Sequence, residues 1–237
     1  MIGWDEILEG GLAPGAAVMS WQGMKGGIEA AHQQANVVMS PSPMAYLDLY
    51  QGDPSVEPPT YSMARLKDSY NWDPVPEGVD PKFILGGQGN LWTEHISNKP
   101  QIEYMAYPRV FALSEVYWSP KENKNWGGFV EKVEDHFKRF DQARQNYAQS
   151  MHDPIIQVTK NASGNLVLDL STEVDDLDIF YTLDSTIPNQ YYNQYTAPVT
   201  IPKDAPQLRV RAFRNGEPMG KLISIKTEDL EKRVKKK

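Results

Sequence analysis

The sequence predicts an α/β domain followed by a small all-β domain, and a change in the apolar pattern supports this division. Up to about residue 150, short apolar runs alternate with longer stretches of helical periodicity. That alternation is typical of βα units around a parallel sheet. After Asp153-Pro154, apolar residues recur at every second position instead, as they do in sandwich strands. The predicted boundary therefore lies near residue 153.

In the first domain the apolar spacing predicts strands and helices in alternation. The expected strands are 17–21, 36–40 and 83–86, and the expected helices are 24–34, 100–118 and 129–150. The helix from Phe129 is amphipathic. Residues 50–81 are rich in Pro, Asp, Gly and Tyr. They form a connection too long for an ordinary loop, which favours a functional role for it.

The second domain is predicted to span 153–227 as a β-sandwich, followed by a basic tail at 228–237. Its period-two runs are 155–159, 166–170, 178–182, 198–201, 208–213 and 221–225. Turn residues separate these runs at regular intervals. The cluster Lys232–Lys237 is interpreted as a solvated or vector-derived end.

Composition excludes several classes of function. The 31 acidic and 24 basic residues give a net charge of −7, which argues against nucleic acid as a partner. Without cysteine there are neither disulfides nor thiolate metal sites. The four histidines lack metal-ligand spacing, so we expect no metal and no cofactor; they are His32, His95, His136 and His152.

The start of the chain does not read as a secretion signal, and no segment reads as a membrane span. The first twenty residues contain Asp5, Glu6 and Glu9 and no basic stretch. No apolar run approaches the ~18 residues needed to cross a bilayer. If the parent protein is periplasmic or secreted, its signal is expected upstream of Met1.

Four segments place aromatic or acidic side chains directly after a predicted strand. They are Gly3–Glu6, Ser20–Gly23, Tyr46–Gln51 and Asn90–Glu94. In a (β/α)8 barrel, the active site is built at the carboxyl ends of the strands. A single tryptophan there more often belongs to the core, but four such segments in succession favour a site. Trp92 and Glu94, two residues apart, could share one face and offer a sugar ring an apolar surface beside a carboxylate.

With these segments the sequence resembles the C-terminal part of the glycoside hydrolase family twenty β-N-acetylhexosaminidases. The matching segments are Gly3–Leu8, Val18–Gly23, Tyr46–Gln51, Tyr70–Pro76, Gly86–Glu94 and Tyr107–Glu115. They follow the family's last four barrel strands in order and cover the predicted first domain, 1–152. The segments 180–184 and 210–213 resemble the small sandwich domain of bacterial members. The resemblance implies strands five to eight of a TIM barrel followed by an all-β sandwich.

The resemblance also implies substrate-assisted retaining hydrolysis, in which the substrate's own acetamido oxygen attacks the anomeric carbon. Tyr46 would donate a hydrogen bond to that oxygen. Asp48 and Glu94 would accept hydrogen bonds from hydroxyls of the terminal sugar. The pocket walls around the acetamido methyl and the sugar face would be Trp4, Trp21 and Trp92.

The family's catalytic Asp-Glu pair, which follows the fourth barrel strand in a Gly-Gly-Asp-Glu segment, has no counterpart in this sequence. Asp5-Glu6 is rejected as that pair because its neighbours Trp4 and Ile7-Leu8 match the next segment of the family. The sugar-binding Arg near the first strand is also missing. We therefore expect a truncated form of a hexosaminidase that binds the sugar but is inactive alone.

Two further expectations concern partners and alternatives. Half a barrel exposes two sheet edges, which predicts a homodimer or association with the missing N-terminal half. The alternative function is a non-catalytic carbohydrate-binding or interaction module, using either the aromatic pocket or the sandwich. The sequence leaves open the physiological glycan and the choice between GlcNAc and GalNAc termini.

Overall fold

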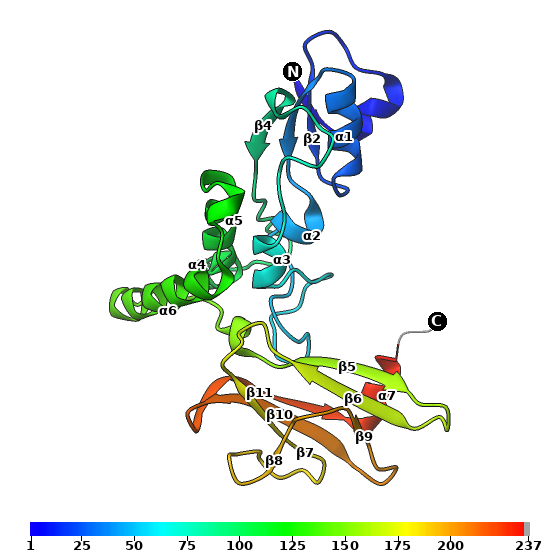
Figure 1. The fold of residues 1–237 in the computed structure, drawn as a ribbon, viewed down its shortest axis with the longest axis vertical. Helices are drawn as coiled ribbons and strands as arrows, with labels where there is room; N and C mark the ends of the chain where they lie inside the picture. Colours follow the sequence, from blue (N-terminus) through cyan, green and yellow to red (C-terminus); the bar gives the residue numbers. More distant parts are fainter. Residues whose placement is uncertain (235–237) are drawn as a thin grey trace. The chain divides into compact units, whose positions relative to one another are not determined.

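The computed structural model describes residues 1–234, which divide into two compact units (Figure 1). The first unit comprises residues 1–50 and 60–148. The second comprises residues 51–59 together with the chain from 149 onward. The structural boundary at 148/149 lies a few residues before the predicted one. The prediction also placed 51–59 in the first domain, whereas the structure places them in the second.

A four-stranded parallel sheet organises the first unit, in the order β1-β2-β3-β4. The strands are β1 (Ile2–Trp4), β2 (Ala17–Ser20), β3 (Asn36–Met39) and β4 (Ile84–Gly87). All three neighbouring pairs run parallel. Their carboxyl ends therefore lie along one edge of the sheet.

The helices of the first unit follow these strands (Figure 1). They are α1 (Lys25–His32), α2 (Ser42–Ala45), α3 (Leu66–Tyr70), α4 (Lys99–Ala106), α5 (Arg109–Trp118) and α6 (Trp126–Ala143). Short 3-10 helices occupy Asp5–Gly10, Pro81–Phe83 and Lys121–Asn123. The helix α1 lies close to the sheet, since a Cβ on Gly27 would come within 2.6 Å of the Met39 sulfur.

Two predicted helices have different bounds in the structure. The stretch 100–118 is two helices, because Pro108 cannot continue the hydrogen-bond ladder of α4. The helix predicted over 129–150 begins at Trp126, where the Asn125 side chain caps the Gly128 amide. It ends at Ala143, since Arg144 adopts the left-handed conformation with φ 53°.

The second unit is a two-sheet β structure. One sheet has the order β5-β6-β9 and the other β11-β10-β7-β8. The strands are β5 (Ile155–Lys160), β6 (Leu166–Ser171), β7 (Asp178–Thr182), β8 (Asn193–Gln194), β9 (Val199–Thr200), β10 (Gln207–Arg214) and β11 (Glu217–Lys226). A 3-10 helix, Ser150–His152, precedes them. Each predicted run corresponds to a strand; only the two-residue β8 is additional.

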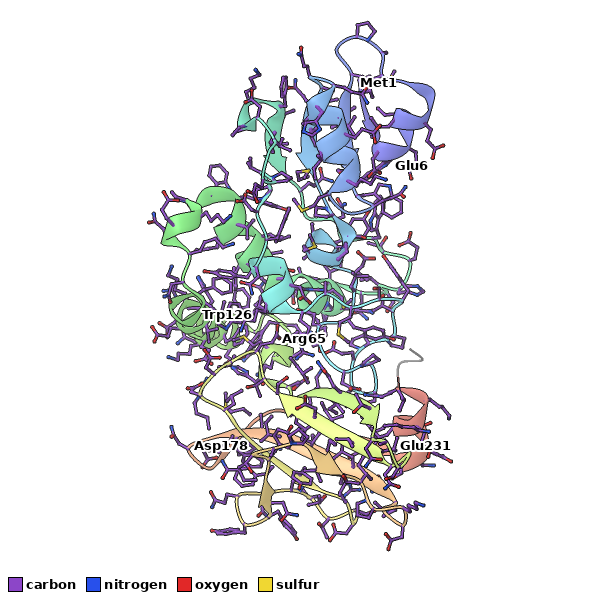
Figure 2. All side chains as sticks on the ribbon, turned by 45° about the vertical axis from the view of Figure 1, so that its right-hand side comes forward. Met1, Glu6, Arg65, Trp126, Asp178 and Glu231 are labelled. Carbon is purple, nitrogen blue, oxygen red and sulfur yellow. The ribbon has the colours of Figure 1, made fainter. Side chains whose placement is uncertain are left out.

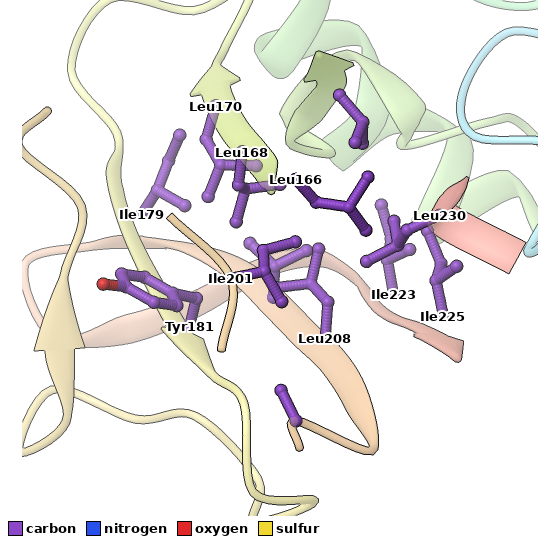
Figure 3. Close-up of a cluster of buried hydrophobic side chains, with 13 residues drawn as sticks. Leu166, Leu168, Leu170, Ile179, Tyr181, Ile201, Leu208, Ile223, Ile225 and Leu230 are labelled. Carbon is purple, nitrogen blue, oxygen red and sulfur yellow. The ribbon is translucent and has the colours of Figure 1, made fainter. Parts of the chain in front are cut away.

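The apolar residues of the period-two pattern form the core of this unit. On β6, Leu166, Leu168 and Leu170 are buried while Asp169 between them is exposed. They pack with buried residues of the other sheet, including Leu208 (Figure 3). Alternate residues of a strand face opposite sides of its sheet, so this alternation separates the core from the surface.

The segment predicted as a solvated basic tail is partly a helix. The structure has α7 at Thr227–Lys232, and the label of its residue Glu231 marks this helix in Figure 2. Its Leu230 is fully buried in the sandwich core. The interpretation of 228–237 as a tail was wrong for this part, because one apolar side chain anchors a helix whose other residues are polar or charged. Residues 235–237 lie outside the described residues.

Replacing Leu230 with alanine is expected to destabilise the second unit by about 2–5 kcal/mol, the usual cost of emptying a fully buried leucine site. Glu231→Ala, one residue further along the same helix at an exposed position, should change stability by less than about 0.5 kcal/mol. Hydrogen exchange of the β10 and β11 amides measures both variants. Equal protection in the two would show that α7 does not support the core.

Candidate functional site

A pocket of about 520 Å³ lies beyond the carboxyl ends of the parallel strands. Its lining residues are Trp4, Glu6, Trp21, Tyr46, Tyr61, Trp92, Glu94 and His95. Five of the six site residues predicted from the sequence are among them. The exception is Asp48, which lies beneath the lining. Tyr61 and His95 were not predicted, and Glu6 was considered only as a catalytic acid and rejected.

The sheet brings these distant residues together. Trp4 is the last residue of β1, and Trp21 directly follows β2. The two segments that follow β3 and β4 stay in register through an isolated parallel bridge between Tyr46 and Asn90. In that bridge the Leu47 amide donates to the Asn90 carbonyl at 2.7 Å. The bridge fixes Tyr46 beside the segment that carries Trp92.

Aromatic rings form the walls. Trp21 stacks on Tyr46 with ring centroids 6.2 Å apart and planes 19° apart. Trp92 lies 6.0 Å from Trp4 and 6.3 Å from Tyr46. Its side chain is 40% exposed, so part of the indole is open to a ligand. Such rings match the C–H faces of a sugar and leave polar tips for its hydroxyls.

Tyr46 is the buried polar group of this aromatic cluster. Burial raises the pKa of its phenol, although hydrogen bonds with the side chains of Trp92 and Asn90 act in the opposite direction. The negative charge of Asp48 adds to the increase. The hydroxyl therefore remains protonated well above neutral pH, and it can donate a hydrogen bond into the pocket.

Glu6 orients a wall of the pocket. Its carboxylate accepts the Trp21 indole N–H at 3.0 Å and the Gln22 side-chain amide at 3.1 Å. Hydrogen bonds from its own backbone amide and from Trp21 lower its pKa. A general acid needs a raised pKa. The arrangement therefore favours an orienting role for Glu6 and agrees with its rejection as the acid.

Asp5, its neighbour, lies outside the pocket lining. Burial raises the pKa of this carboxyl. One oxygen, Oδ2, accepts the Gln22 amide at 3.3 Å, and the other, Oδ1, has no hydrogen-bond partner among the described residues. Asp5 is packed against α1, since a Cβ on Gly26 would lie 2.6 Å from the Asp5 Cβ. It therefore contacts the turn after β2 rather than the pocket.

Asp48 contacts the pocket lining through a hydrogen bond with Tyr61. Only 4% of Asp48 is exposed, and its Oδ2 accepts the hydroxyl of Tyr61. Burial and this hydrogen bond raise the pKa of the Tyr61 phenol far above its usual range. Asp48 Oδ1 is buried and has no hydrogen-bond partner within residues 1–234. This carboxylate thus keeps one acceptor atom that makes no hydrogen bond and is closed to solvent.

Tyr61 and His95 define the mouth, with ring centroids 6.3 Å apart. Glu94 is exposed beside them. Tyr61 comes from the Pro- and Tyr-rich stretch 50–81, whose unusual length was the only signal in the sequence that pointed to it. That stretch was expected to be functional, but no residue in it was singled out.

Within residues 1–234, no three His, Cys, Asp or Glu side chains are grouped so that they could hold a metal ion. None of the helices in this part is long and apolar enough to cross a membrane.

Parallel strands that end at one edge in tryptophans and carboxylates are the arrangement expected of part of a barrel glycosidase. Residues 1–121 match the family "Glycosyl hydrolase family 20, catalytic domain", and residues 168–227 match "Fn3 associated". The chain belongs to glycosyl hydrolase family 20.

Curated relatives extend this match. A Beta-hexosaminidase of Porphyromonas gingivalis is 35% identical over 96% of this chain and 30% of its own length. A Beta-N-acetylhexosaminidase of Cellulomonas fimi is 32% identical over 57% of this chain and 29% of its own length. The chain therefore spans about a third of these curated relatives. They support a fragment of a hexosaminidase and give no support to the non-catalytic alternative.

Solved structures show the same fold. The GH20 exo-β-N-acetylglucosaminidase of Vibrio harveyi, in complex with N-acetylglucosamine, superposes with a TM-score of 0.57 at 31% identity, covering 62% of this chain and 24% of that one. The Streptomyces plicatus N-acetyl-β-hexosaminidase gives 0.58 at 25% identity, covering 63% and 32%. The predicted fold class, part of a TIM barrel followed by a β domain, is confirmed.

Proposed function

We propose that this chain supplies the sugar-binding half of an enzyme that removes terminal β-linked N-acetylhexosamine from glycans. The observation that carries the proposal is the pocket itself. Three tryptophans and a buried tyrosine wall it, and carboxylates lie at its base and mouth. The names of the relatives, all hexosaminidases, agree with this substrate class.

The proposed mechanism assigns each residue a role in substrate-assisted hydrolysis. Tyr46 donates its hydroxyl proton in a hydrogen bond to the acetamido oxygen as that oxygen attacks the anomeric carbon. Asp48 and Glu94 accept hydrogen bonds from hydroxyls of the terminal sugar. The walls that hold the acetamido methyl and the sugar face are Trp4, Trp21 and Trp92. The protonated state of Tyr46 supports its role as a donor.

The acid that protonates the leaving oxygen is proposed to come from sequence preceding this chain. We expect the purified chain to release no product from a chromogenic β-N-acetylglucosaminide. It should nonetheless bind N-acetylglucosamine, with a change in tryptophan fluorescence. A longer form that includes the preceding barrel half should hydrolyse the substrate. Turnover by this chain alone, abolished by Glu6→Gln, would contradict both the role of Glu6 and the need for an upstream acid.

Exposed apolar residues on the first unit support the proposed association with another polypeptide. The sheet edges β1 and β4 carry Ile2, 49% exposed, and Leu85, 61% exposed. Trp118 at the end of α5 is 88% exposed. We propose that these edges pair with the preceding barrel half or, in its absence, with a second copy. Light scattering of the purified chain should show a dimer or larger species, and a monodisperse monomer would contradict this.

We also propose that the parent protein is periplasmic or secreted, where terminal hexosamines of external glycans are available to it. Fractionation of cells that express the longer protein tests this proposal. Recovery of the protein with cytoplasmic markers alone would overturn it.

A further inference from the structure

Asn90 is a buried polar residue to which the proposed mechanism gives no role, and it lies beside Tyr46. It is only 7% exposed. Its backbone amide donates to the Ala45 carbonyl at 2.9 Å, and its carbonyl accepts the Leu47 amide at 2.7 Å. These two bonds hold the main chain of Asn90 on both sides of Tyr46, its partner in the isolated parallel bridge. The main chains of the two residues are therefore fixed against each other.

The hydrogen bonds around the Asn90 side chain run in one direction, which a backbone carbonyl sets. The Ser40 hydroxyl donates its proton to the Gln88 carbonyl at 2.9 Å, and a carbonyl only accepts. The Ser40 oxygen therefore accepts from Asn90, whose Nδ2 lies 2.7 Å away. On the other side, the Gln88 side-chain amide donates to Asn90 Oδ1 at 2.5 Å. The Asn90 amide group thus turns its nitrogen toward Ser40 and its oxygen toward Gln88.

The nitrogen of Asn90 carries two protons, of which Ser40 accepts one. The side chains of Asn90 and Trp92 both hydrogen bond to the Tyr46 phenol, and both bonds act to lower its pKa. A hydrogen bond lowers the pKa of a phenol when it is donated to the oxygen, because it then stabilises the phenolate. An indole N–H has no other option, since it only donates. The Tyr46 oxygen therefore accepts from two neighbours.

This arrangement decides where the proton of Tyr46 points. A phenol has one proton, and an oxygen that already accepts from two sides keeps that proton for a third partner. We propose that Asn90 is a positioning residue of the site: it donates with Trp92 to the Tyr46 oxygen, which turns the phenol proton into the pocket. Trp92 thereby serves both as a wall and as a donor. That the acceptor in the pocket is the acetamido oxygen of the substrate rests on the proposed function, whereas the direction of the hydrogen bonds does not.

The direction of these bonds is tested in the purified chain without any sugar. Tyr46→Phe keeps the aromatic contacts with Trp21 and Trp92 but removes the acceptor. In nuclear magnetic resonance spectra we expect the Trp92 indole N–H and one side-chain N–H of Asn90 to shift and to exchange with water on the order of tenfold faster. The Trp21 indole N–H, which donates to Glu6 at 3.0 Å, is the internal control and should change little. An unaltered Trp92 indole N–H would overturn the proposal.

A role that acts through Tyr46 also predicts how two substitutions combine. In the longer form of the protein, with its preceding barrel half, Asn90→Ala should lower kcat for a chromogenic β-N-acetylglucosaminide about tenfold and change KM little. In the Tyr46→Phe background the same substitution should cause no further loss, because the phenol through which it acts is gone. An equal loss in both backgrounds would assign Asn90 a merely structural role and overturn the proposal.

Asn90→Asp reverses the hydrogen bond while keeping the shape of the side chain. A carboxylate only accepts, so it would take the Tyr46 proton away from the pocket, and kcat should fall as far as in Tyr46→Phe, about 10²–10³-fold. The matched control is Asn98→Asp, at the exposed N-cap of α4, where the side chain accepts the Gln101 amide at 3.0 Å. Aspartate caps a helix as well as asparagine does, so kcat should be unchanged.

Wild-type kcat in Asn90→Asp would contradict the proposal. Asn90→Ala keeps the test valid if the buried charge of Asn90→Asp unfolds the first unit. If the unsubstituted longer form hydrolyses no β-N-acetylglucosaminide, the proposed function fails. The resonances of Trp92 and Asn90 in the purified chain alone then decide whether the two side chains direct the Tyr46 proton.

Discussion

Replacing Arg109 with methionine is expected to lower the stability of the first unit by about 3–5 kcal/mol, enough to leave much of it unfolded. Arg109 is fully buried on α5. It donates hydrogen bonds to the carbonyl oxygens of Ala64 at 2.9 Å, Met105 at 2.8 Å and Leu47. Methionine fills a similar volume but would leave these carbonyls without their donor. Each buried, unsatisfied group costs about 1–3 kcal/mol.

The position of these carbonyls gives Arg109 a link to the pocket. Leu47 immediately precedes Asp48, and Ala64 lies three residues after Tyr61, whose hydroxyl donates to Asp48. The Arg109 guanidinium therefore links α5 to the segment that carries Asp48 and to the segment that carries Tyr61. A lysine could not replace it, because a single ammonium cannot reach three carbonyls spread over a planar fork.

Urea unfolding followed by tryptophan fluorescence measures this effect on the first unit alone, because all six tryptophans lie between residues 4 and 126. Arg139→Met on α6, which removes an exposed cation, is the control and should shift stability by less than about 0.5 kcal/mol. Equal midpoints for the two variants would show that the buried guanidinium contributes no net stability.

The sequence predicts the walls of the pocket because strand ends are a local signal. Trp4, Trp21 and Trp92 each follow an apolar run, and parallel strands end at one edge of the sheet. That rule, together with the family resemblance, is sufficient to bring residues almost ninety positions apart into one group, as the structure does. No contact between them has to be known in advance.

Tyr61 could not be predicted in the same way. It lies 13 residues from its partner Asp48, in a stretch without any periodicity. It follows residues 51–59, which belong to the other structural unit. Contacts over such a separation leave no mark on local pattern. The burial of Leu230, a single apolar residue among charges, was missed for the same reason.

The end of α6 shows that apolar periodicity does not predict where a helix stops. Tyr147 has the spacing of the α6 apolar face, and its ring does stack on Phe137 with centroids 4.1 Å apart. It does so from a segment after Ala143 that is neither helix nor strand, since the helix has already ended at the left-handed Arg144. The apolar pattern thus grouped Tyr147 with the side chains that it does pack against, but placed it inside the helix instead of after it.

Tyr46→Phe, introduced into the longer form of the protein with its preceding barrel half, is expected to reduce kcat for a chromogenic β-N-acetylglucosaminide by about 10²–10³-fold. The phenylalanine ring keeps the stacking on Trp21 and the contact with Trp92, so KM should change little. What is lost is a donor aimed at charge that develops on the acetamido oxygen only as it attacks. Tyr191→Phe, at an 86% exposed position of the second unit, should leave both constants unchanged.

The division of the effect between kcat and KM, and its dependence on pH, distinguish this role from simple binding. A rise in KM with kcat unaltered would show that Tyr46 binds substrate and transition state equally, against the proposed role. Because the pKa of Tyr46 is raised above its usual value of 10.0, mainly by burial, the phenol stays protonated up to and beyond the pH at which exposed tyrosines ionise. The ratio of wild-type to Tyr46→Phe rates should therefore stay constant from mildly acidic to mildly alkaline pH. If the ratio fell near neutrality, an ionised Tyr46 would be implied, and a phenolate cannot donate the hydrogen bond that the mechanism requires.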